Sequence, residues 1–421
     1  MPLYQESLAL QPQTPLASIR DIHGKLYPFQ EAAVQYALKR KRCFIADPSG
    51  SGKTIMALAS IAMACAFPLV VVCPPNLLPH WQTEIAKWFP GWPVQVLKGA
   101  SLQRNQKAYL VSYPQLQKTL QLLAGLRPRS IIFDESHRLK GYETRQTQLS
   151  TELAKRVDYR FLLTSSPIVN RPADLMSQLK VMGRWDVLVN VRYFSETYCG
   201  AWYDGGIKSP SGSANLSRLE EQLRFYCMVR RTEEQLMAYL PEKIINPVYL
   251  EVDRKIDNLW GGWFRYARID VQELRRNAYK LKRNAVIEWL EGARSLEGKT
   301  VVFGYHTEYI RELAEIFSGL LVTGDNSLQQ IQETLHNFQK DPDAKFLFLT
   351  YGTGSQGWQL DFADRVVMVE LDWSDSTHQR AAGRLSSLLR EKTIQVYRLL
   401  ARGTYEDHML GIIEEKKASG A

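Results

Sequence analysis

The chain has 421 residues, of which 45% are hydrophobic and 23% charged, and this is the composition of a globular protein long enough for two domains. Its 53 basic and 44 acidic residues give a formal net charge of +9, which favours a polyanionic partner. The absence of an uninterrupted apolar run of about 18 residues argues against a membrane span, and five scattered cysteines without a CxxC pair argue against a zinc site.

Short apolar runs alternate with helical patterns over the first 165 residues or so. Five strands are predicted in this stretch, at Cys43–Ala46, Leu69–Cys73, Tyr109–Ser112, Ile131–Phe133 and Phe161–Thr164. Continuous apolar strands separated by helices are typical of a parallel sheet that is covered on both faces. The first part of the chain is therefore expected to form an α/β domain.

The run DPSGSGKT at 47–54 follows the first of these strands and precedes a helix candidate at Thr54–Ala66. A strand–loop–helix unit of this kind directs backbone N–H groups and the positive end of a helix dipole at a polyphosphate. Its glycines allow close approach, its lysine can reach the β- and γ-phosphates, and its threonine can ligate Mg²⁺. We expect ATP at the following residues: Asp47, Gly50, Ser51, Gly52, Lys53 and Thr54.

Two adjacent carboxylates follow the fourth predicted strand, in the sequence DESH at 134–137. A carboxylate at the carboxyl end of a strand, opposite a phosphate loop, can hold Mg²⁺ through its water shell, and Asp134 fits that role. Glu135 is then the candidate that orients and activates the attacking water. His137 either links the ATP site to LLTSSP at 162–167 or simply packs.

Gln30 lies upstream of the phosphate loop, in the sequence LYPFQ. A side-chain amide donates and accepts at once, so it can pair with the edge of adenine. Without the other motifs, an exposed glutamine at a helix start would be the better interpretation.

The pattern changes between the two α/β stretches. Tyr198–Ser217 is rich in glycine, serine and aromatic residues, which predicts a loop excursion. An amphipathic helix is predicted from apolar residues at alternating spacings of three and four: Val271, Leu274, Ala278, Leu281 and Ala285. Its solvent face is expected to carry Arg268, Arg275, Arg276, Lys282 and Arg283. From Arg254 to Arg283 there are nine basic and three acidic residues, which could line a DNA path or form a solvated face.

A second alternation of strands and helices follows. Its predicted strands are Val301–Phe303, Leu320–Thr323, Phe346–Thr350, Val366–Glu370 and Thr393–Tyr397. The fold class is therefore α/β, with two tandem doubly wound parallel-sheet lobes and a helical insertion between them. The predicted domains are an extension at 1–22, lobe 1 at 23–250 with an insertion at about 184–240, a basic helical linker or protrusion at 251–295, and lobe 2 at 296–421.

The order of the motifs resembles the superfamily-2 helicase core of the Swi/Snf type. The segments are LYPFQ, DPSGSGKT, VVVCPPNLLPHW, DESH, LLTSSPIVNRPADL, VVFGYH, GTGSQGWQLDFAD and HQRAAGR. Asp47 supports the resemblance, because this family usually writes its loop D-E-x-G-x-G-K-T. DESH, NRPADL at 170–175 and GSAN at 212–215 are most similar to the annealing-helicase, fork-remodelling branch.

The resemblance implies roles for further residues, position by position. ATP-binding roles fall on Gln30, Asp47, Gly50, Ser51, Gly52, Lys53, Thr54, Gly357, Arg380 and Arg384. Catalytic roles fall on Lys53, Asp134, Glu135 and Arg384, with Thr54 and Asp134 as Mg²⁺ ligands. Coupling of ATP to DNA falls on His137, Thr164 and Ser166. DNA-backbone contacts fall on Pro74, Trp81, His306, Gly324, Gly354 and Ser355.

The last motif departs from the family pattern Q-x-x-x-R-x-H-R-x-G-Q, in which two arginines serve the ATP site. Arg384 takes the first arginine position, Ser387 the second, and Arg380 replaces the leading glutamine. An arginine finger can contribute several orders of magnitude in rate. Either Arg380 or Arg390 compensates, or Ser387 attenuates hydrolysis.

The resemblance implies an ATP hydrolase that uses ATP and Mg²⁺ and translocates along DNA (duplex, fork or junction), mainly through backbone contacts. Fork remodelling or branch migration is expected by analogy with the branch. The alternatives are an ATP-binding DNA scaffold with weak hydrolysis, and a strand-separating DNA or RNA helicase. We expect a monomer without a membrane partner, cytoplasmic if bacterial or phage-encoded and nuclear if eukaryotic.

Overall fold

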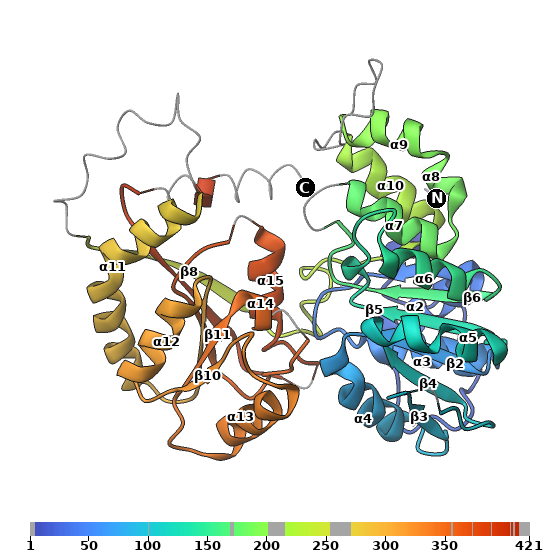
Figure 1. The fold of residues 1–421 in the computed structure, drawn as a ribbon, viewed down its shortest axis with the longest axis horizontal. Coiled ribbons are helices and arrows are strands. Elements are labelled where there is room, and N and C mark those ends of the chain that lie inside the picture. The colour runs from blue at the N-terminus through green and yellow to red at the C-terminus, as the bar shows by residue number, and fades with distance from the viewer. Residues whose placement is uncertain are drawn as a thin grey trace. The chain divides into compact units, whose positions relative to one another are not determined.

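The chain divides into two compact units, Met1–Ala238 and Tyr239–Ala421. Figure 1 draws the first unit from blue to green and the second from yellow-green to red. The computed structural model describes residues 5–99, 101–168, 172–200, 215–252, 271–354, 357–372, 374–388, 390–404, 406 and 409–411. Within these residues, no helix combines the length and apolar character needed to cross a bilayer.

The described part of the first unit contains a seven-stranded sheet in the order β3-β4-β2-β5-β6-β1-β7, with every neighbouring pair parallel. Its strands are β1 (Arg42–Ile45), β2 (Leu69–Cys73), β3 (Val94–Val96), β4 (Ala108–Ser112), β5 (Ser130–Asp134), β6 (Tyr159–Leu163) and β7 (Met228–Val229). All residues of β2 and β4 are buried, because both faces of the sheet are covered.

Helices alternate with these strands along the chain. The α-helices are α1 (Gln5–Leu8), α2 (Pro28–Arg40), α3 (Lys53–Ala64), α4 (Leu78–Trp88), α5 (Leu116–Gly125), α6 (Arg145–Ala154), α7 (Ala173–Met182), α8 (Trp185–Leu188), α9 (Val191–Tyr198) and α10 (Leu216–Tyr226). The 3₁₀ turns are η1 (Pro75–Leu77), η2 (Tyr113–Gln115) and η3 (Ser136–Arg138). In Figure 1, α8, α9 and α10 group together at one end of this unit, before the chain returns to the sheet as β7.

The second unit contains, in its described residues, a six-stranded parallel sheet in the order β10-β11-β9-β12-β13-β8. Its strands are β8 (Lys243–Leu250), β9 (Thr300–Gly304), β10 (Leu320–Val322), β11 (Phe346–Thr350), β12 (Arg365–Met368) and β13 (Ile394–Ala401). Its helices are α11 (Val271–Arg294), α12 (Thr307–Ile316), α13 (Leu328–Lys340), α14 (Tyr351–Gly354) and α15 (Asp375–Gly383).

Successive residues of the second sheet point to two separate cores. Phe303 packs in a core with residues of α13 and α15, whereas its neighbour Val302 packs in a core with residues of α11 and α12. This alternation is the period of two that a strand imposes on its side chains. Both units are thus doubly wound parallel-sheet lobes, and the predicted fold class is confirmed.

Two predicted domain boundaries differ from the structure. All eight residues of β8 pair with β13, so 243–250 belong to the second sheet and the extension of lobe 1 to residue 250 is wrong. The helix predicted as a linker is α11, and its buried residues complete a core of the second unit. Distant partners decide both boundaries, a strand about 150 residues away for β8 and the core of the second unit for α11, and local composition does not report them.

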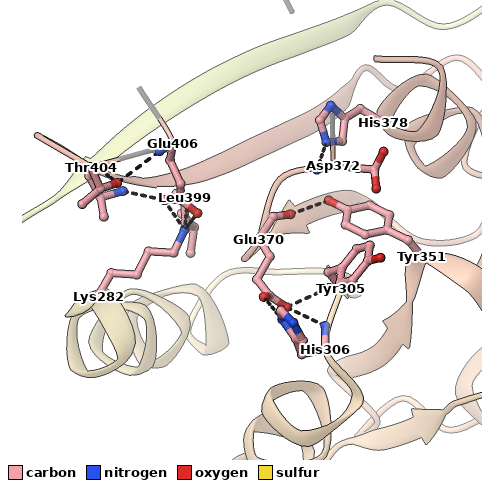
Figure 2. A network of polar contacts seen from close by, with 11 residues as sticks. Lys282, Tyr305, His306, Tyr351, Glu370, Asp372, His378, Leu399, Thr404 and Glu406 are labelled. Atoms are coloured by element: carbon pink, nitrogen blue, oxygen red, sulfur yellow. Dashed lines mark hydrogen bonds and ion pairs between the residues drawn. The ribbon is translucent and has the colours of Figure 1, made fainter. Parts of the chain in front are cut away.

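The predicted solvent face of α11 is also wrong at two positions. Arg275 is 5% exposed, with its guanidinium 3.9 Å from the ring centre of Tyr305, and Lys282 is fully buried. Figure 2 shows Lys282 reaching the Glu406 carboxylate, at 2.6 and 2.7 Å from its two oxygens. Arg268 lies outside the described residues. In the sequence, a lysine or arginine that is buried against a carboxylate cannot be told from one that is solvated, so the packing face of α11 was not fully predicted.

Candidate functional site

Four segments with expected roles follow four neighbouring strands of the first sheet. In the order β2-β5-β6-β1, the strands lead into Pro74–Trp81, Asp134–His137, Thr164–Ser166 and the phosphate loop at 47–54. Because the carboxyl ends of parallel strands meet at one edge of a sheet, these segments gather there. The sequence motifs therefore converge inside the first unit.

The phosphate loop has the backbone that its glycines predict. Gly50 and Gly52 both have φ of 81°, in the left-handed region where a side chain would strain the chain. Gly52 caps α3, so the first backbone N–H groups of that helix open onto the loop. The hydroxyl of Ser51 is buried without a hydrogen-bond partner among the described residues. This loop has the features of a polyphosphate cradle.

Lys53 and Gln30 are both tied to the phosphate loop. The Lys53 ammonium donates to the backbone oxygens of Asp47 at 2.9 Å and Pro48 at 3.1 Å. The Gln30 amide donates to the Ser51 carbonyl at 2.9 Å, while its oxygen accepts the backbone N–H of Tyr27 at 3.0 Å. Gln30 is only 2% exposed, so it is not the free helix-start glutamine of the alternative interpretation. Its contact with adenine stays a prediction.

Asp47 was predicted to bind ATP, and in the structure its side chain forms a buried ion pair with Arg231. The carboxylate is fully buried and accepts the guanidinium of Arg231 and, at 2.8 Å, the backbone N–H of Arg231. A second bond, of 3.0 Å, joins the same guanidinium to the carbonyl of Phe29, next to Gln30. The Asp47 side chain therefore anchors the start of the loop, and a contact of this residue with ATP stays a prediction. Arg231 was missed because 184 residues separate the partners.

Asp134 lies at the end of β5 with one donor on each carboxylate oxygen. The indole N–H of Trp81 donates to Oδ2 at 2.8 Å, and the backbone N–H of Glu135 donates to Oδ1 at 2.9 Å. Burial, together with the neighbouring charge of Glu135, raises the pKa of Asp134 to about 6, while the Trp81 bond and Lys53 oppose the rise. A carboxylate near a cation and free of further donors retains lone pairs for a metal-bound water shell.

These oxygens fit Mg²⁺. The donor set expected for the ion is the Asp134 carboxylate and the Thr54 hydroxyl at the start of α3, both hard oxygen ligands. Among the described residues, no group of three or more histidine, cysteine or acidic side chains could hold a metal by itself. In nucleotide sites, Mg²⁺ is usually held by one or two protein groups together with substrate phosphates.

Trp81 was predicted to touch DNA, but it is 0% exposed and its indole N–H is committed to Asp134. A direct contact of this side chain with DNA is therefore wrong for the described structure. Pro74, predicted for the same role, is buried as well. The apolar ring packs in the core because α4 presents one buried face, formed by Trp81 and Ile85 one turn apart.

The three coupling residues form one network around His137. Its Nδ1 lies 3.3 Å from the Glu135 carboxylate and 3.2 Å from the Thr164 hydroxyl, which also accepts the backbone N–H of Ser166 at 3.1 Å. Glu135 has φ of 48°, an unusual value for a side-chain-bearing residue. His137 therefore joins the DESH turn to the end of β6 and is more than a packing residue.

A second polar network occupies the strand ends of the second unit, and Figure 2 shows its centre at Glu370. One carboxylate oxygen accepts the backbone N–H groups of Tyr305 at 2.8 Å and His306 at 2.9 Å, and the other lies 2.6 Å from the His306 ring. The Tyr351 hydroxyl donates to the Glu370 carbonyl at 2.7 Å. Glu370 thus ties together the turns that follow β9, β11 and β12.

This network continues to the helix that carries the expected arginines. The backbone N–H of Asp372 donates to His378 Nε2 at 2.8 Å, which fixes α15 to the turn after β12. Arg380 lies in the last turn of α15 and is 8% exposed, and Arg384 is the residue that ends the helix. Their contacts with ATP stay predictions.

Ser387 lines a cavity of about 350 Å³ in the second unit, together with Arg390 and acidic residues including Asp361. Arg390 was one candidate to replace the missing second arginine. Its guanidinium instead donates to three backbone carbonyls, those of Asp361 and Ala363 at 2.6 Å each and Lys392 at 2.9 Å. Arg390 is therefore engaged in holding its own loop.

The remaining predicted glycines have different surroundings. Gly324 is exposed, with open space where a Cβ would stand. Gly354 is buried, and a Cβ there would lie 2.2 Å from the ring of Phe303, so packing alone requires this glycine. Gly357 has φ of 91°, which favours glycine at that turn. Ser355 lies outside the described residues.

Comparison with known proteins gives a family match over most of the chain. The model of the family described as "SNF2-related domain" matches residues 29–298. The "DNA annealing helicase and endonuclease ZRANB3" of Homo sapiens is 26% identical over 437 residues, which cover 94% of this chain and 40% of that protein. The "SWI/SNF-related matrix-associated actin-dependent regulator of chromatin subfamily A-like protein 1" of Drosophila melanogaster is 26% identical over 428 residues, covering 96% and 56%. The chain thus spans about half the length of these curated relatives.

A solved structure shares the fold. It is titled "Sulfolobus solfataricus SWI2/SNF2 ATPase core in complex with dsDNA", and it matches with a TM-score of 0.50 at 20% identity, over 96% of this chain and 94% of that one.

Proposed function

Because the chain belongs to the SNF2-related domain family, we propose that it is a DNA-dependent ATPase that translocates along duplex or branched DNA. It is an ATP hydrolase of the superfamily-2 helicase type. One observation carries the catalytic part of the proposal: the phosphate loop follows β1, and Asp134 and Glu135 lie at the end of β5, on either side of β6, so they gather at one edge of the first sheet. Fork remodelling or branch migration is the finer activity that we propose.

The chemistry requires little beyond positioning and charge stabilisation. The N–H groups at the start of α3 and the Lys53 ammonium would cradle the β- and γ-phosphates. Glu135 would orient the attacking water, held in its unusual backbone conformation with His137 beside its carboxylate. Asp134 and Thr54 would hold Mg²⁺, which would neutralise charge on the phosphates.

The DNA part of the proposal rests on charge and on relatives. The net charge of +9 favours a polyanion, and the solved neighbour is titled as a complex with double-stranded DNA. The name of one relative includes annealing helicase, which supports a branched substrate. Contacts mainly to the DNA backbone predict affinity that depends weakly on sequence and falls steeply with salt.

An ATPase assay across DNA structures tests the proposal. Turnover is measured without DNA and with single-stranded, duplex, forked and four-way-junction DNA, and Lys53→Ala serves as the inactive control. We expect duplex-containing DNA to stimulate turnover, with the largest effect for forks or junctions. Turnover that is the same with and without DNA, or that equals the Lys53→Ala control, would refute the proposed DNA translocase. A triplex-displacement assay then separates translocation from unwinding of a plain tailed duplex.

A second function, an ATP-binding DNA scaffold with weak hydrolysis, is favoured by one observation. Ser387 stands where the family has its second arginine, and Arg390 is held by three backbone carbonyls. Comparing the wild type with Ser387→Arg decides between the two functions. A large gain in turnover in the variant, from a low starting rate, supports the scaffold, and an unchanged rate supports the motor.

A further inference from the structure

Trp81 is the residue of α4 that reaches the metal-binding edge of the first sheet. It is fully buried, and its indole N–H donates to Asp134 Oδ2 at 2.8 Å. The other carboxylate oxygen accepts the backbone N–H of Glu135, which belongs to the same turn. Trp81 is therefore the donor that orients this carboxylate from a different element, 53 residues away in the chain.

The position of α4 makes this bond more than a packing contact. The helix begins at Leu78, directly after η1 and the end of β2. Trp81 and Ile85 are its only fully buried residues in the described structure, so a shift of α4 moves the indole N–H relative to Asp134. A hydrogen bond weakens steeply with misalignment, so small shifts suffice.

We propose that Trp81 is a positioning residue that holds the Asp134 carboxylate in the orientation that Mg²⁺ needs, and so supports Mg²⁺-dependent ATP binding and turnover. The proposal rests on the proposed ATPase function and deepens it. With the indole bond in place, each carboxylate oxygen has one donor and keeps a free lone pair toward the ion. Without it, the carboxylate can rotate, and the site must order it each time the ion binds.

The chain offers a matched control in Tyr113. Its hydroxyl donates to the backbone carbonyl of Asp134 at 2.9 Å, so it is also a buried aromatic residue with one hydrogen bond to the same amino acid. Tyr113→Phe removes a bond to the backbone, whereas Trp81→Phe removes a bond to the carboxylate. A purely structural role would give the two variants similar effects.

Two measurements test whether Trp81 positions the Asp134 carboxylate. The first is binding of a non-hydrolysable ATP analogue while Mg²⁺ is titrated, and the second is ATPase turnover with and without duplex DNA. For Trp81→Phe we expect the Mg²⁺ concentration at half-saturation to rise about tenfold, because one hydrogen bond to a charged group is lost. Analogue binding without Mg²⁺ and DNA affinity should stay within about twofold of wild type, while the Mg²⁺ concentration for half-maximal turnover rises about tenfold. Tyr113→Phe should keep wild-type values in both measurements.

Replacing Trp81 by benzothienylalanine, in which sulfur takes the place of the indole N–H, keeps the ring volume and guards against a variant that fails to fold. Wild-type Mg²⁺ dependence in this variant overturns the proposal, as does an equal effect of Tyr113→Phe. If DNA does not stimulate the wild type, the proposed motor fails, while the Mg²⁺ titration still decides the role of Trp81.

Discussion

Asp47→Asn tests whether the buried ion pair with Arg231 holds the start of the phosphate loop. Both side chains are 0% exposed, and Arg231 gives the carboxylate a guanidinium bond and a backbone N–H bond. Asparagine keeps the shape and an acceptor but removes the charge. The guanidinium then stays buried, with the Phe29 carbonyl as its remaining acceptor among the described residues.

The expected cost follows from that burial. Removing one partner of a buried pair costs about 3–5 kcal/mol, because the other charge is left uncompensated. The acceptor that asparagine retains offsets about 1 kcal/mol, which leaves a loss of about 3 kcal/mol. For a unit of this size, the melting temperature of the first unit should fall by roughly 6–12 °C.

The assay is calorimetric unfolding, with binding of an ATP analogue measured in parallel. Glu196→Gln is the control, because Arg192 and Glu196 form an exposed pair at 2.8 Å, with side chains 73% and 42% exposed. Such a pair contributes about 0.5 kcal/mol at most. If Asp47→Asn melts within about 1 °C of this control, the pair does not anchor the loop and the reasoning from burial is wrong.

Three further predictions concern buried carboxylates. Protons and Mg²⁺ compete for Asp134, whose raised pKa of about 6 leaves the carboxyl half protonated at pH 6 and ionised at pH 8. Mg²⁺ titrations of turnover should therefore need about twofold more ion at pH 6 than at pH 8, and equal values would contradict the raised pKa. Glu370→Gln removes the charge and one of the two carboxylate oxygens that bond His306 and the backbone N–H groups, and should lower the stability of the second unit by about 2–3 kcal/mol in denaturant titration, whereas an unshifted midpoint would argue against a central role. Lys282→Met should cost about 3–5 kcal/mol by leaving Glu406 buried alone, and adding Glu406→Gln should restore most of it; additive losses in this double-mutant cycle would speak against the pair.

The ten strands predicted from the sequence are all present, with ends shifted by a few residues. They could be predicted because a strand buried on both faces is a continuous apolar run. β3, β7 and β8 were missed for physical reasons. β7 has two residues, and β8 is an edge strand whose residues are mostly exposed or half-buried, so neither forms such a run. Only pairing with a distant strand defines β7 and β8.

The candidate site was predictable where a motif follows a strand, and hidden where it depends on a distant partner. The phosphate loop, Asp134 and Glu135 could be placed because the strand order brings carboxyl ends to one edge. The sequence did not predict that the Trp81 indole bonds Asp134, or that the Arg231 guanidinium bonds Asp47. An aromatic ring and a basic side chain have many destinations in a folded chain, and no local pattern distinguishes them.

The polar networks of the two units follow a common physical logic. Asp134 and Glu370 are carboxylates at strand ends, and their described partners are mostly N–H groups of turns and rings, with no lysine or arginine bonded to either. Such donors stabilise the charge of the carboxylate and also fix its orientation, because each N–H points in one direction. A turn that moves must break the bond or carry the carboxylate along. We therefore expect these buried bonds to hold the turns around each carboxylate in place, and substitutions that remove one N–H donor should loosen those turns before they unfold the protein.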